Sequence, residues 1–122
     1  MIVSPGGKKI FPEELELYLE RSEYIKECLV YEPDPEQMGY LAVAIVPDRE
    51  SVDVYLDRQG ISPDTESYLR AERSLFEAVV RENNLKFPAY KQIHQVYVRH
   101  RDFVKTTTKK IKRTDPDNLD NN

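Results

Sequence analysis

The sequence predicts an α+β domain in which helices back a small three-stranded antiparallel sheet, with a glycine-loop β-hairpin at the N-terminus. Two observations support this prediction. Segments with strand and helix patterns follow one another in the order ββ-α-β-β-α-α-β, with turn residues between them. The 122 residues are 39% hydrophobic and 33% charged, which is typical of one globular domain that holds its core without disulfides.

The N-terminal hairpin is predicted from two short extended segments, Met1–Val3 and Lys9–Phe11, on either side of the turn-forming run Ser4–Lys8. A helix is predicted next, from about Pro12 to Arg21. Proline suits the first helical position, and the two glutamates after it stabilise the positive end of the helix dipole. The apolar residues of this segment fall on one helical face: Leu15, Tyr18 and Leu19.

Three further segments are predicted to be strands. Ile25–Tyr31 is rich in β-prone residues and ends at a turn that contains two prolines. Tyr40–Val46 is almost continuously apolar and stops at Pro47, which is typical of a central strand covered on both faces. The last strand is predicted in the extended stretch Gln92–Arg99, which carries Ile93, Val96 and Val98.

Two helices are predicted between the central strand and the last one. Ser51 is a candidate N-cap for a short helix that ends at Gly60. A longer helix is predicted to start at Ser62–Asp64 and to continue to Asn83–Asn84. Glu72 interrupts its apolar stripe, which consists of residues at helical spacing: Tyr68, Leu75, Phe76, Val79 and Val80.

The composition bears on where the protein is located and on whether it contains disulfides or a metal site. The single cysteine, Cys28, excludes a disulfide within the chain, and its place in a predicted strand indicates an inert buried thiol. The longest apolar run is far shorter than the ~20 residues of a membrane helix, and no signal-peptide pattern is present, so we expect a cytoplasmic protein without an integral membrane segment. His94 and His100 lack partners at metal-ligand spacing, so we expect surface or strand-packing residues and no metal site.

Charge is unevenly distributed, although the net charge is only -4. The stretch Arg99–Arg113 holds seven of the 18 basic residues and one acid, Asp102. Such a cluster predicts a local anion site rather than the extended basic surface of a nucleic-acid-binding protein. The residues after it are polar and turn-rich, which predicts a folded domain over 1–113 and a disordered polar tail over 114–122.

Two segments carry residues that suit chemistry, Gly6–Glu16 and Lys105–Arg113. Each also has a purely structural explanation: the first as a turn followed by a helix start, the second as a solvated basic tail. A hydroxyl-rich loop followed by lysines also binds phosphate, because backbone N–H groups, hydroxyls and ammonium groups all suit an oxyanion. The sequence contains no GxxxxGK[ST] or GxGxxG motif with which to bind a nucleotide by itself.

Together the two segments resemble motifs of the C-terminal domain of adenylate-forming enzymes, the AMP-binding superfamily, and acyl-CoA synthetases in particular. The first is similar to the Gly-x-x-Ile-x-Pro-x-Glu-[Ile/Val/Leu]-Glu motif that opens this domain, and the second to the closing Pro-Lys-Thr-x-x-Gly-Lys-[Ile/Leu]-x-Arg motif. The resemblance covers 1–113, because Ile25–Val30 and Gly39–Val46 lie where the family has its two core strands. Val104 and Lys109 stand where the family usually has proline and glycine.

The resemblance implies a two-step ligase. A fatty acid and ATP give an acyl-adenylate and pyrophosphate, and the thiol of CoA then displaces AMP. ATP, Mg²⁺ and CoA are therefore expected in the complete enzyme, and none is expected on the isolated domain. The motif match implies that Lys110 is the catalytic lysine of the first step, since an ammonium group offsets the repulsion between carboxylate and phosphate. The adjoining phosphate-proximal loop would consist of Thr106, Thr107, Thr108 and Lys109.

In the family's second step the C-terminal domain rotates, and its glycine hairpin reaches the active site. The resemblance implies that Gly6, Gly7 and Lys8 then face the pantetheine arm of CoA, since glycine lets a narrow ligand approach the backbone. The implied partner is the N-terminal ATP- and acyl-binding domain of the same protein. We expect the isolated domain to be an inactive monomer. The long spacer Asp48–Leu85 resembles that of long-chain fatty acid-CoA ligases.

Two hypotheses from other classes stay open on the residues alone. One is a small module that binds RNA or another polyanion through its basic C-terminal segment, although no aromatic residue is interleaved there to stack on bases. A steep salt dependence of oligonucleotide binding would favour it. The other is a regulatory domain that senses a small molecule, which requires a closed apolar pocket. We expect the ligase domain, with no nucleic acid as partner.

Overall fold

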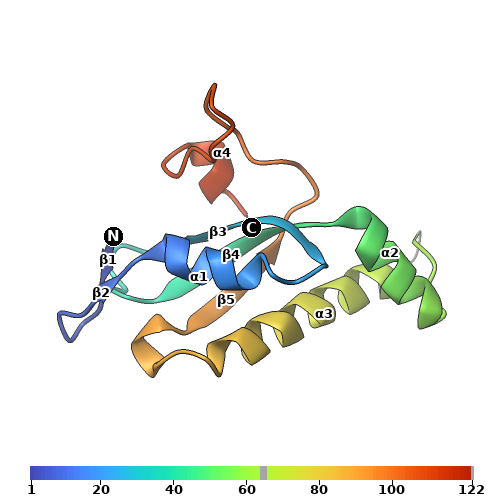
Figure 1. The fold of residues 1–122 in the computed structure, drawn as a ribbon, viewed down its shortest axis with the longest axis horizontal. Coiled ribbons are helices and arrows are strands. Elements are labelled where there is room, and N and C mark those ends of the chain that lie inside the picture. The colour runs from blue at the N-terminus through green and yellow to red at the C-terminus, as the bar shows by residue number, and fades with distance from the viewer. Residues whose placement is uncertain (64–65, 122) are drawn as a thin grey trace.

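The computed structural model describes residues 1–63 and 66–121 (Figure 1). Its element order confirms the predicted ββ-α-β-β-α-α-β succession and adds one turn of 3-10 helix and a short C-terminal helix. The elements are β1 (Ile2–Val3), β2 (Lys9–Ile10), α1 (Pro12–Leu19), β3 (Ile25–Tyr31), β4 (Leu41–Pro47), α2 (Arg49–Arg58), α3 (Glu66–Asn84), η1 (Ala89–Lys91), β5 (Ile93–Val98) and α4 (Pro116–Leu119).

The strands form two sheets, and the predicted α+β class is confirmed. β1 and β2 make the expected antiparallel hairpin, with Ile2 opposite Ile10. The larger sheet has the order β3-β4-β5 and is mixed rather than wholly antiparallel: β3 pairs antiparallel with β4, but β5 pairs parallel with it. The prediction was wrong on β5 because α2 and α3 form a crossover that returns the chain to the other end of β4, so that the next strand runs parallel.

The central strand β4 is buried along its whole length, as its apolar sequence predicts. On one face Val43 and Ile45 belong to the main core, which includes residues of α1 and α3. On the other face Ala44 and Val46 pack with Phe103, from the segment that follows β5. Figure 1 shows α3 and α4 on opposite sides of the strands. The helices therefore cover one face of the sheet, and the C-terminal segment covers the other.

The helices form where the sequence predicts them, with differences of a few residues at some of their ends. α1 begins at Pro12, as predicted, and ends at Leu19. α2 begins before Ser51, because Asp48 is its N-cap and accepts a hydrogen bond from the Ser51 N–H at 3.1 Å. α3 ends at Asn84, as predicted; of its expected start at Ser62–Asp64, the first two residues precede the helix and Asp64 lies outside the described residues. In the described part of the chain, no helix is long and apolar enough to cross a bilayer.

The polar interruption of the α3 stripe is a buried ion pair. Glu72 is 1% exposed, and its carboxylate lies 2.7 Å from Nη1 of Arg49 and 2.7 Å from Nε2 of His100. These contacts link α3 to α2 and to the end of β5. His100 itself is exposed, and the other histidine, His94, stacks on Tyr40, so both are the surface or strand-packing residues that the sequence predicts.

Residues 114–121 are folded, contrary to the disorder predicted over 114–122, of which Asn122 lies outside the described residues. They contain α4, which Asp115 caps by accepting a hydrogen bond from the Asp117 N–H at 2.9 Å. Asn118 is fully buried, and Asn121 donates to the hydroxyl of Tyr31 at 2.9 Å. A polar, turn-rich sequence suggests disorder when its polar groups lack partners. Here the rest of the domain supplies those partners, which the composition of the segment does not reveal.

The packing of α3 gives a stability prediction. Phe76 is completely buried in the main core, so Phe76→Ala should lower the free energy of unfolding by about 3–5 kcal/mol through lost contacts and a residual cavity. Leu69 lies on the same helix but is 55% exposed, and Leu69→Ala should cost about 0.5 kcal/mol or less. Urea denaturation of both variants measures the difference, and equal losses would contradict this core assignment.

Candidate functional site

The glycine hairpin between β1 and β2 closes with a defined three-residue loop. The Gly7 N–H donates to the Ser4 carbonyl at 2.9 Å, and the Ser4 N–H donates to the Lys8 carbonyl at 2.9 Å. Gly7 has a φ of 81°, the left-handed conformation that this kind of loop requires at its third position. The Ser4 hydroxyl accepts from the Lys8 N–H at 3.1 Å. The loop therefore presents Gly6, Gly7 and Lys8 at an exposed tip.

The lysine hairpin, residues 104–112, repeats this loop. The Lys109 N–H donates to the Thr106 carbonyl at 2.9 Å, and the Thr106 N–H donates to the Lys110 carbonyl at 2.8 Å. The Thr106 hydroxyl accepts from the Lys110 N–H at 3.2 Å, as that of Ser4 does from Lys8. An antiparallel bridge between Lys105 and Ile111 continues the hairpin below the tip. Lys110 thus occupies the position in this loop that Lys8 occupies in the other.

Lys109 adopts the backbone conformation that the loop demands. Its φ is 63°, and it is the only non-glycine residue with positive φ among the described residues. A left-handed conformation costs a residue with a side chain roughly 1–2 kcal/mol relative to the right-handed one. The hydrogen bonds of the hairpin hold Lys109 there nonetheless. Lys109 therefore takes the left-handed conformation that Gly7 has in the other hairpin, and it adds a second ammonium group beside Lys110.

The base of the lysine hairpin is anchored by an ion pair to α1. Glu16 is 7% exposed and accepts two hydrogen bonds from the guanidinium of Arg113, one of them from Nη1 at 2.9 Å. The same carboxylate accepts the Val30 N–H of β3 at 2.8 Å. Glu16 ends the first motif and Arg113 ends the second, so this pair joins the two motifs across 97 residues of sequence.

Burial and hydrogen bonding have opposite effects on the pKa values of Glu16 and Arg113. Burial raises the pKa of the Glu16 carboxyl, and the hydrogen bonds from Arg113 and the Val30 N–H oppose that rise. The hydrogen bond to Glu16 in turn raises the pKa of Arg113. Three charge-assisted or backbone hydrogen bonds to one buried carboxyl make the contact geometrically specific.

A second set of contacts fixes the other strand of the hairpin to β3. Nζ of Lys105 lies 2.8 Å from the carboxylate of Glu27, and this hydrogen bond raises the pKa of the lysine. Glu27 also accepts the Phe103 N–H at 3.3 Å. Ile111 packs against the cluster that contains Phe103 on the outer face of the sheet. Both strands of the hairpin are therefore attached to the domain, and only its tip projects.

Ion pairing divides the basic stretch into two groups. Four of its seven cations bind carboxylates of this domain, and the other three, Lys109, Lys110 and Lys112, are exposed and form no ion pair within 1–63 or 66–121. The cationic character that is left for a ligand is thus confined to the hairpin. The pairs are Arg99 and Arg101 with Asp117, Lys105 with Glu27, and Arg113 with Glu13 and Glu16.

The two hairpins are not brought together in this structure. Figure 1 shows the loop between β1 and β2 at one end of the domain and the loop before α4 at another. A Cβ atom added at Gly7 would meet no atom within 4 Å, so the tip of the glycine hairpin faces open space. Nζ of Lys8 lies 5.1 Å from the ring centroid of Tyr90. The predicted residues therefore form two separate exposed sites, one around Gly6 and Gly7 and one around Lys110.

The remaining candidates from the sequence take structural roles. Cys28 is completely buried, and burial raises the pKa of its thiol well above the usual value, so it is the inert residue that the sequence predicts. No group of three or more His, Cys, Asp or Glu side chains suited to a metal occurs among the described residues.

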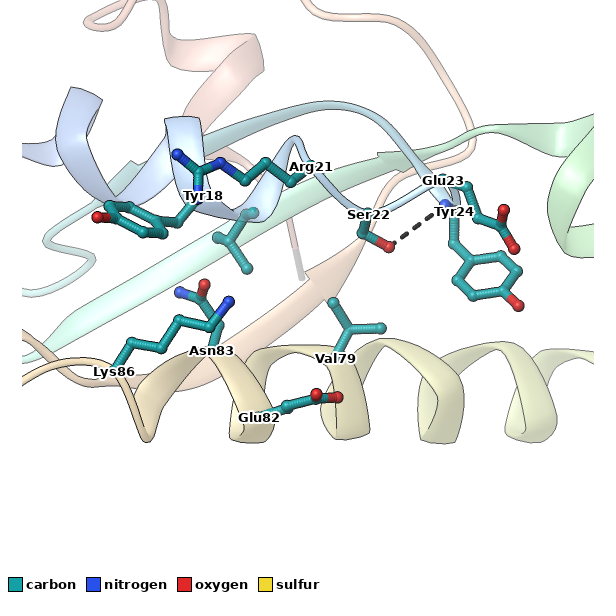
Figure 2. Close-up of a pocket in the computed structure, with 10 residues that line it drawn as sticks. Tyr18, Arg21, Ser22, Glu23, Tyr24, Val79, Glu82, Asn83 and Lys86 are labelled. Carbon is teal, nitrogen blue, oxygen red and sulfur yellow. Dashed lines mark hydrogen bonds between the residues drawn. The ribbon is translucent and has the colours of Figure 1, made fainter.

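A hollow of about 460 Å³ lies between the end of α1 and α3, and Figure 2 shows its lining. The hollow is open to solvent, and charged side chains line it beside apolar ones. The guanidinium of Arg21 and the ammonium of Lys86 lie 4.4 and 5.8 Å from the ring centroid of Tyr18. Glu23 and Glu82 also line it. This hollow is not the closed apolar pocket that a small-molecule sensor requires.

Sequence reasoning missed the residues that hold the hairpin. Arg113 and Glu16 were recognised only as motif positions, and their ion pair was not predicted. A buried acid in the first motif and a basic residue that closes the second were the available signal, because opposite charges at such positions suggest a pair. Asn118 and Arg99 gave no signal, because their partners are mostly backbone atoms of distant segments.

Comparison with known proteins identifies the fold. No protein-family model and no curated protein sequence matches the chain. Among solved structures, the adenylation domain of a carboxylate reductase from Mycobacterium chelonae matches 92% of the chain with a TM-score of 0.68 and 20% identity. A Brucella canis acyl-CoA synthetase matches 93% with a TM-score of 0.62 and 18% identity, and a benzoate CoA ligase from Burkholderia xenovorans matches 87% with 0.61 and 21%.

The chain spans only 17–18% of the length of these three structures. It therefore has the fold of one part of these longer proteins, in agreement with the resemblance of its two motifs. At these identities the likeness shows the fold, and the function has to be argued from the two hairpins.

The Glu16–Arg113 pair gives the second prediction. Glu16→Ala should lower the free energy of unfolding by about 2–3 kcal/mol, because the Val30 N–H and the half-buried guanidinium both lose their acceptor. Glu13 pairs with the same Arg113 at 3.4 Å, but its side chain is 60% exposed. Glu13→Ala should therefore cost about 0.5 kcal/mol or less. Chemical denaturation compares the two, and similar losses would show that the buried carboxylate is not the anchor.

Proposed function

We propose that this chain is the mobile C-terminal domain of an ATP-dependent acyl-CoA synthetase, in which Lys110 serves acyl-adenylate formation and the glycine hairpin serves thioester formation. The observation that supports this most strongly is the lysine hairpin itself. Its base is fixed by Glu16 and Glu27, and its exposed tip carries an unpaired cation at the position that the motif assigns to catalysis. The likeness of the fold to adenylation domains and CoA ligases agrees with it.

Lys110 would act in the first step by placing its ammonium group between the substrate carboxylate and the α-phosphate of ATP. The two anions repel each other, and charge grows on the phosphoryl oxygens as they react. A cation on a pre-formed loop stabilises that charge without reorganising. The hydroxyls of Thr106 and Thr108 lie 3.0 Å apart and help to shape the tip. Lys109 adds positive charge beside the reacting phosphate.

Gly6 and Gly7 would act in the second step, after the domain has turned its other hairpin to the active site. The tip is open around Gly7, so the backbone can come close to a narrow thiol-bearing arm. Lys8 would supply a cation on that route. Since the two hairpins lie at different ends of the domain, one orientation cannot place both at a single active site.

The residues present fit ATP and CoA as substrates but only as part of a site. The lysine hairpin offers cations and hydroxyls to a phosphate, yet it has no cradle for a base or ribose. Mg²⁺ would neutralise the β- and γ-phosphates, and its ligands would come from the N-terminal ATP- and acyl-binding domain, where the acyl-chain specificity also resides. We therefore propose that the N-terminal domain is the partner of this chain within the same protein. We also propose that this chain on its own is inactive, monomeric and cytoplasmic.

We propose a long-chain fatty acid as the substrate, because the segment between β4 and β5 contains α2 and the 19-residue α3 and resembles in length the spacer of long-chain fatty acid-CoA ligases. The polyanion-binding alternative is less well supported, because four of the seven cations on which it depends are paired within the domain. What is left is a single short loop of lysines without aromatic side chains, which is too small for a nucleic-acid track.

The assignment of Lys110 is tested in the complete ligase by separating the half-reactions. Lys110→Ala should slow acyl-adenylate formation by about a hundredfold or more and leave thioester formation from a supplied acyl-adenylate nearly unchanged. Lys109→Ala is the matched control, and it should have a much smaller effect. If Lys109→Ala abolishes adenylation and Lys110→Ala does not, the motif register is shifted by one residue.

The glycine hairpin should give the opposite result. Gly6 is the cleaner probe, because a Cβ there meets only the Ser4 hydroxyl at 4.0 Å, whereas any side chain at Gly7 is strained by its positive φ. Gly6→Leu should slow thioester formation by about tenfold or more by obstructing the pantetheine route, with adenylation spared. Pre-steady-state assays of the two steps measure this, and an equal loss in both would refute the separate roles of the hairpins.

A further inference from the structure

The C-terminal segment holds the lysine hairpin through one side chain, that of Asn118. Its Oδ1 accepts the Val104 N–H at 2.8 Å, and its Nδ2 donates to the Val104 carbonyl at 3.0 Å and to the Lys112 carbonyl at 2.8 Å. Val104 and Lys112 are the two ends of the hairpin, and they are also joined by a hydrogen bond from the Lys112 N–H to the Val104 carbonyl at 3.0 Å. The Asn118 amide therefore bonds to both strands at the base of the hairpin.

Because Asn118 is buried, loss of its hydrogen bonds would destabilise the base of the hairpin. Asn118 is 0% exposed, so the backbone groups that it satisfies have little access to water. If the amide were lost, the Val104 N–H would lose its acceptor, and the Val104 and Lys112 carbonyls would each keep only one donor, the N–H of Lys112 and of Asp115 respectively. The base of the hairpin would then open more often, which would let the hairpin shift relative to the sheet and expose its own backbone hydrogen bonds to exchange.

Asn118 is itself fixed by a second buried side chain. Arg99 is 3% exposed and donates to the Asp117 carbonyl at 3.0 Å and to the Asn121 side chain at 2.7 Å, on either side of Asn118. It also donates to the Asp102 carbonyl at 3.2 Å. Arg99 follows directly after β5, so it attaches the C-terminal segment to the end of the sheet.

We propose that Asn118 is a positioning residue for Lys110: the C-terminal segment is a latch that locks the base of the lysine hairpin and so fixes the direction in which the ammonium group points. This inference rests on the proposed function of Lys110. Electrostatic stabilisation of a transition state depends on a pre-set geometry, and a displacement of about 1 Å can cost a hundredfold in rate. The latch acts only on the lysine hairpin, because no hydrogen bond or ion pair within 1–63 and 66–121 links it to the glycine hairpin at the other end of the domain.

The matched control is Asn84, which makes the same kind of contact elsewhere. Its amide accepts the Ile93 N–H and donates to the Ile93 carbonyl, both at 2.9 Å, and so clamps the start of β5 to the end of α3. Asn118→Leu and Asn84→Leu each replace an amide by an apolar side chain of similar size and remove its bonds to backbone. Both should lower stability, but only the first touches the hairpin.

Hydrogen exchange on the 122-residue chain tests the latch without any assay of catalysis. Asn118→Leu should accelerate exchange of the Thr106 and Lys112 amides by about tenfold or more, although neither amide bonds to Asn118 itself. Asn84→Leu should leave these two amides unchanged after correction for its effect on global stability. Equal exchange of the hairpin amides in both variants would overturn the proposal.

The half-reactions of the complete ligase test the consequence for Lys110. At matched folded fractions, Asn118→Leu should lower the kcat of adenylation about tenfold or more with little change in the KM for ATP, and it should spare thioester formation. Asn84→Leu should change neither. Truncation after Arg113 removes Asn118 together with the partners of Arg99 in this segment, so it should slow adenylation at least as much as Asn118→Leu does.

The outcomes separate this inference from the function on which it rests. If Lys110→Ala slows adenylation but Asn118→Leu behaves like Asn84→Leu, the latch is refuted and the proposed function stands. If Asn118→Leu slows both half-reactions equally, its role is structural only, and the positioning role is refuted. If Lys110→Ala has no effect on adenylation, the proposed function itself fails, and the positioning role fails with it.

Discussion

The hydrogen-bonded pair of Glu16 and Arg113 is the contact on which the arrangement of this domain depends. One buried carboxylate on α1 receives the guanidinium from the end of the lysine hairpin and the N–H of Val30 from β3. It therefore fixes three segments at one point: the helix that follows the glycine hairpin, an edge strand of the sheet and the segment that carries Lys110. A single buried acid can do this because its oxygens accept several hydrogen bonds, and burial makes an unsatisfied acid costly. The two motifs are thereby parts of one structural unit, even though their exposed tips face different directions.

The two hairpins have the same loop conformation but present different side chains at their tips. In each hairpin a hydroxyl residue precedes the three-residue loop, a left-handed residue ends the loop, and a lysine follows it. Glycine takes the left-handed position in the first hairpin without strain, so that tip is bare backbone. Lysine takes it in the second, so that tip carries adjacent ammonium groups. The difference between a surface that a narrow ligand can approach and one that attracts an oxyanion thus lies in the side chains, because the loop geometry is shared.

The charges of the C-terminal region follow from the same organisation. A sheet face covered by a polar segment must satisfy many buried polar groups, and Arg99, Lys105 and Arg113 are used for that purpose. Their pairing with acids of the domain concentrates the remaining positive charge on Lys109, Lys110 and Lys112. A stretch that looks uniformly basic in sequence therefore contains four cations that pair with acids of the domain and three that are exposed without an ion pair among the described residues. The segment around Asn118 supports the hairpin, since its amide bonds to backbone on both strands of the hairpin.

The sequence by itself determined the element order, the buried central strand, the glycine hairpin and the place of Lys110 at the end of a hydroxyl-rich loop. Each of these rests on local pattern: apolar periodicity, turn residues and motif spacing act over a few residues and leave a direct trace in the chain. Only the tertiary structure decided the parallel pairing of β5, the pairing of Glu16 with Arg113, the left-handed conformation of Lys109 and the folding of residues 114–121. These features depend on partners far away in sequence, which supply the crossover path, the buried acceptor or the backbone groups that satisfy Asn118. A local pattern contains no record of such partners, so the polar C-terminal segment is ordered by the domain it packs against and not by its own composition.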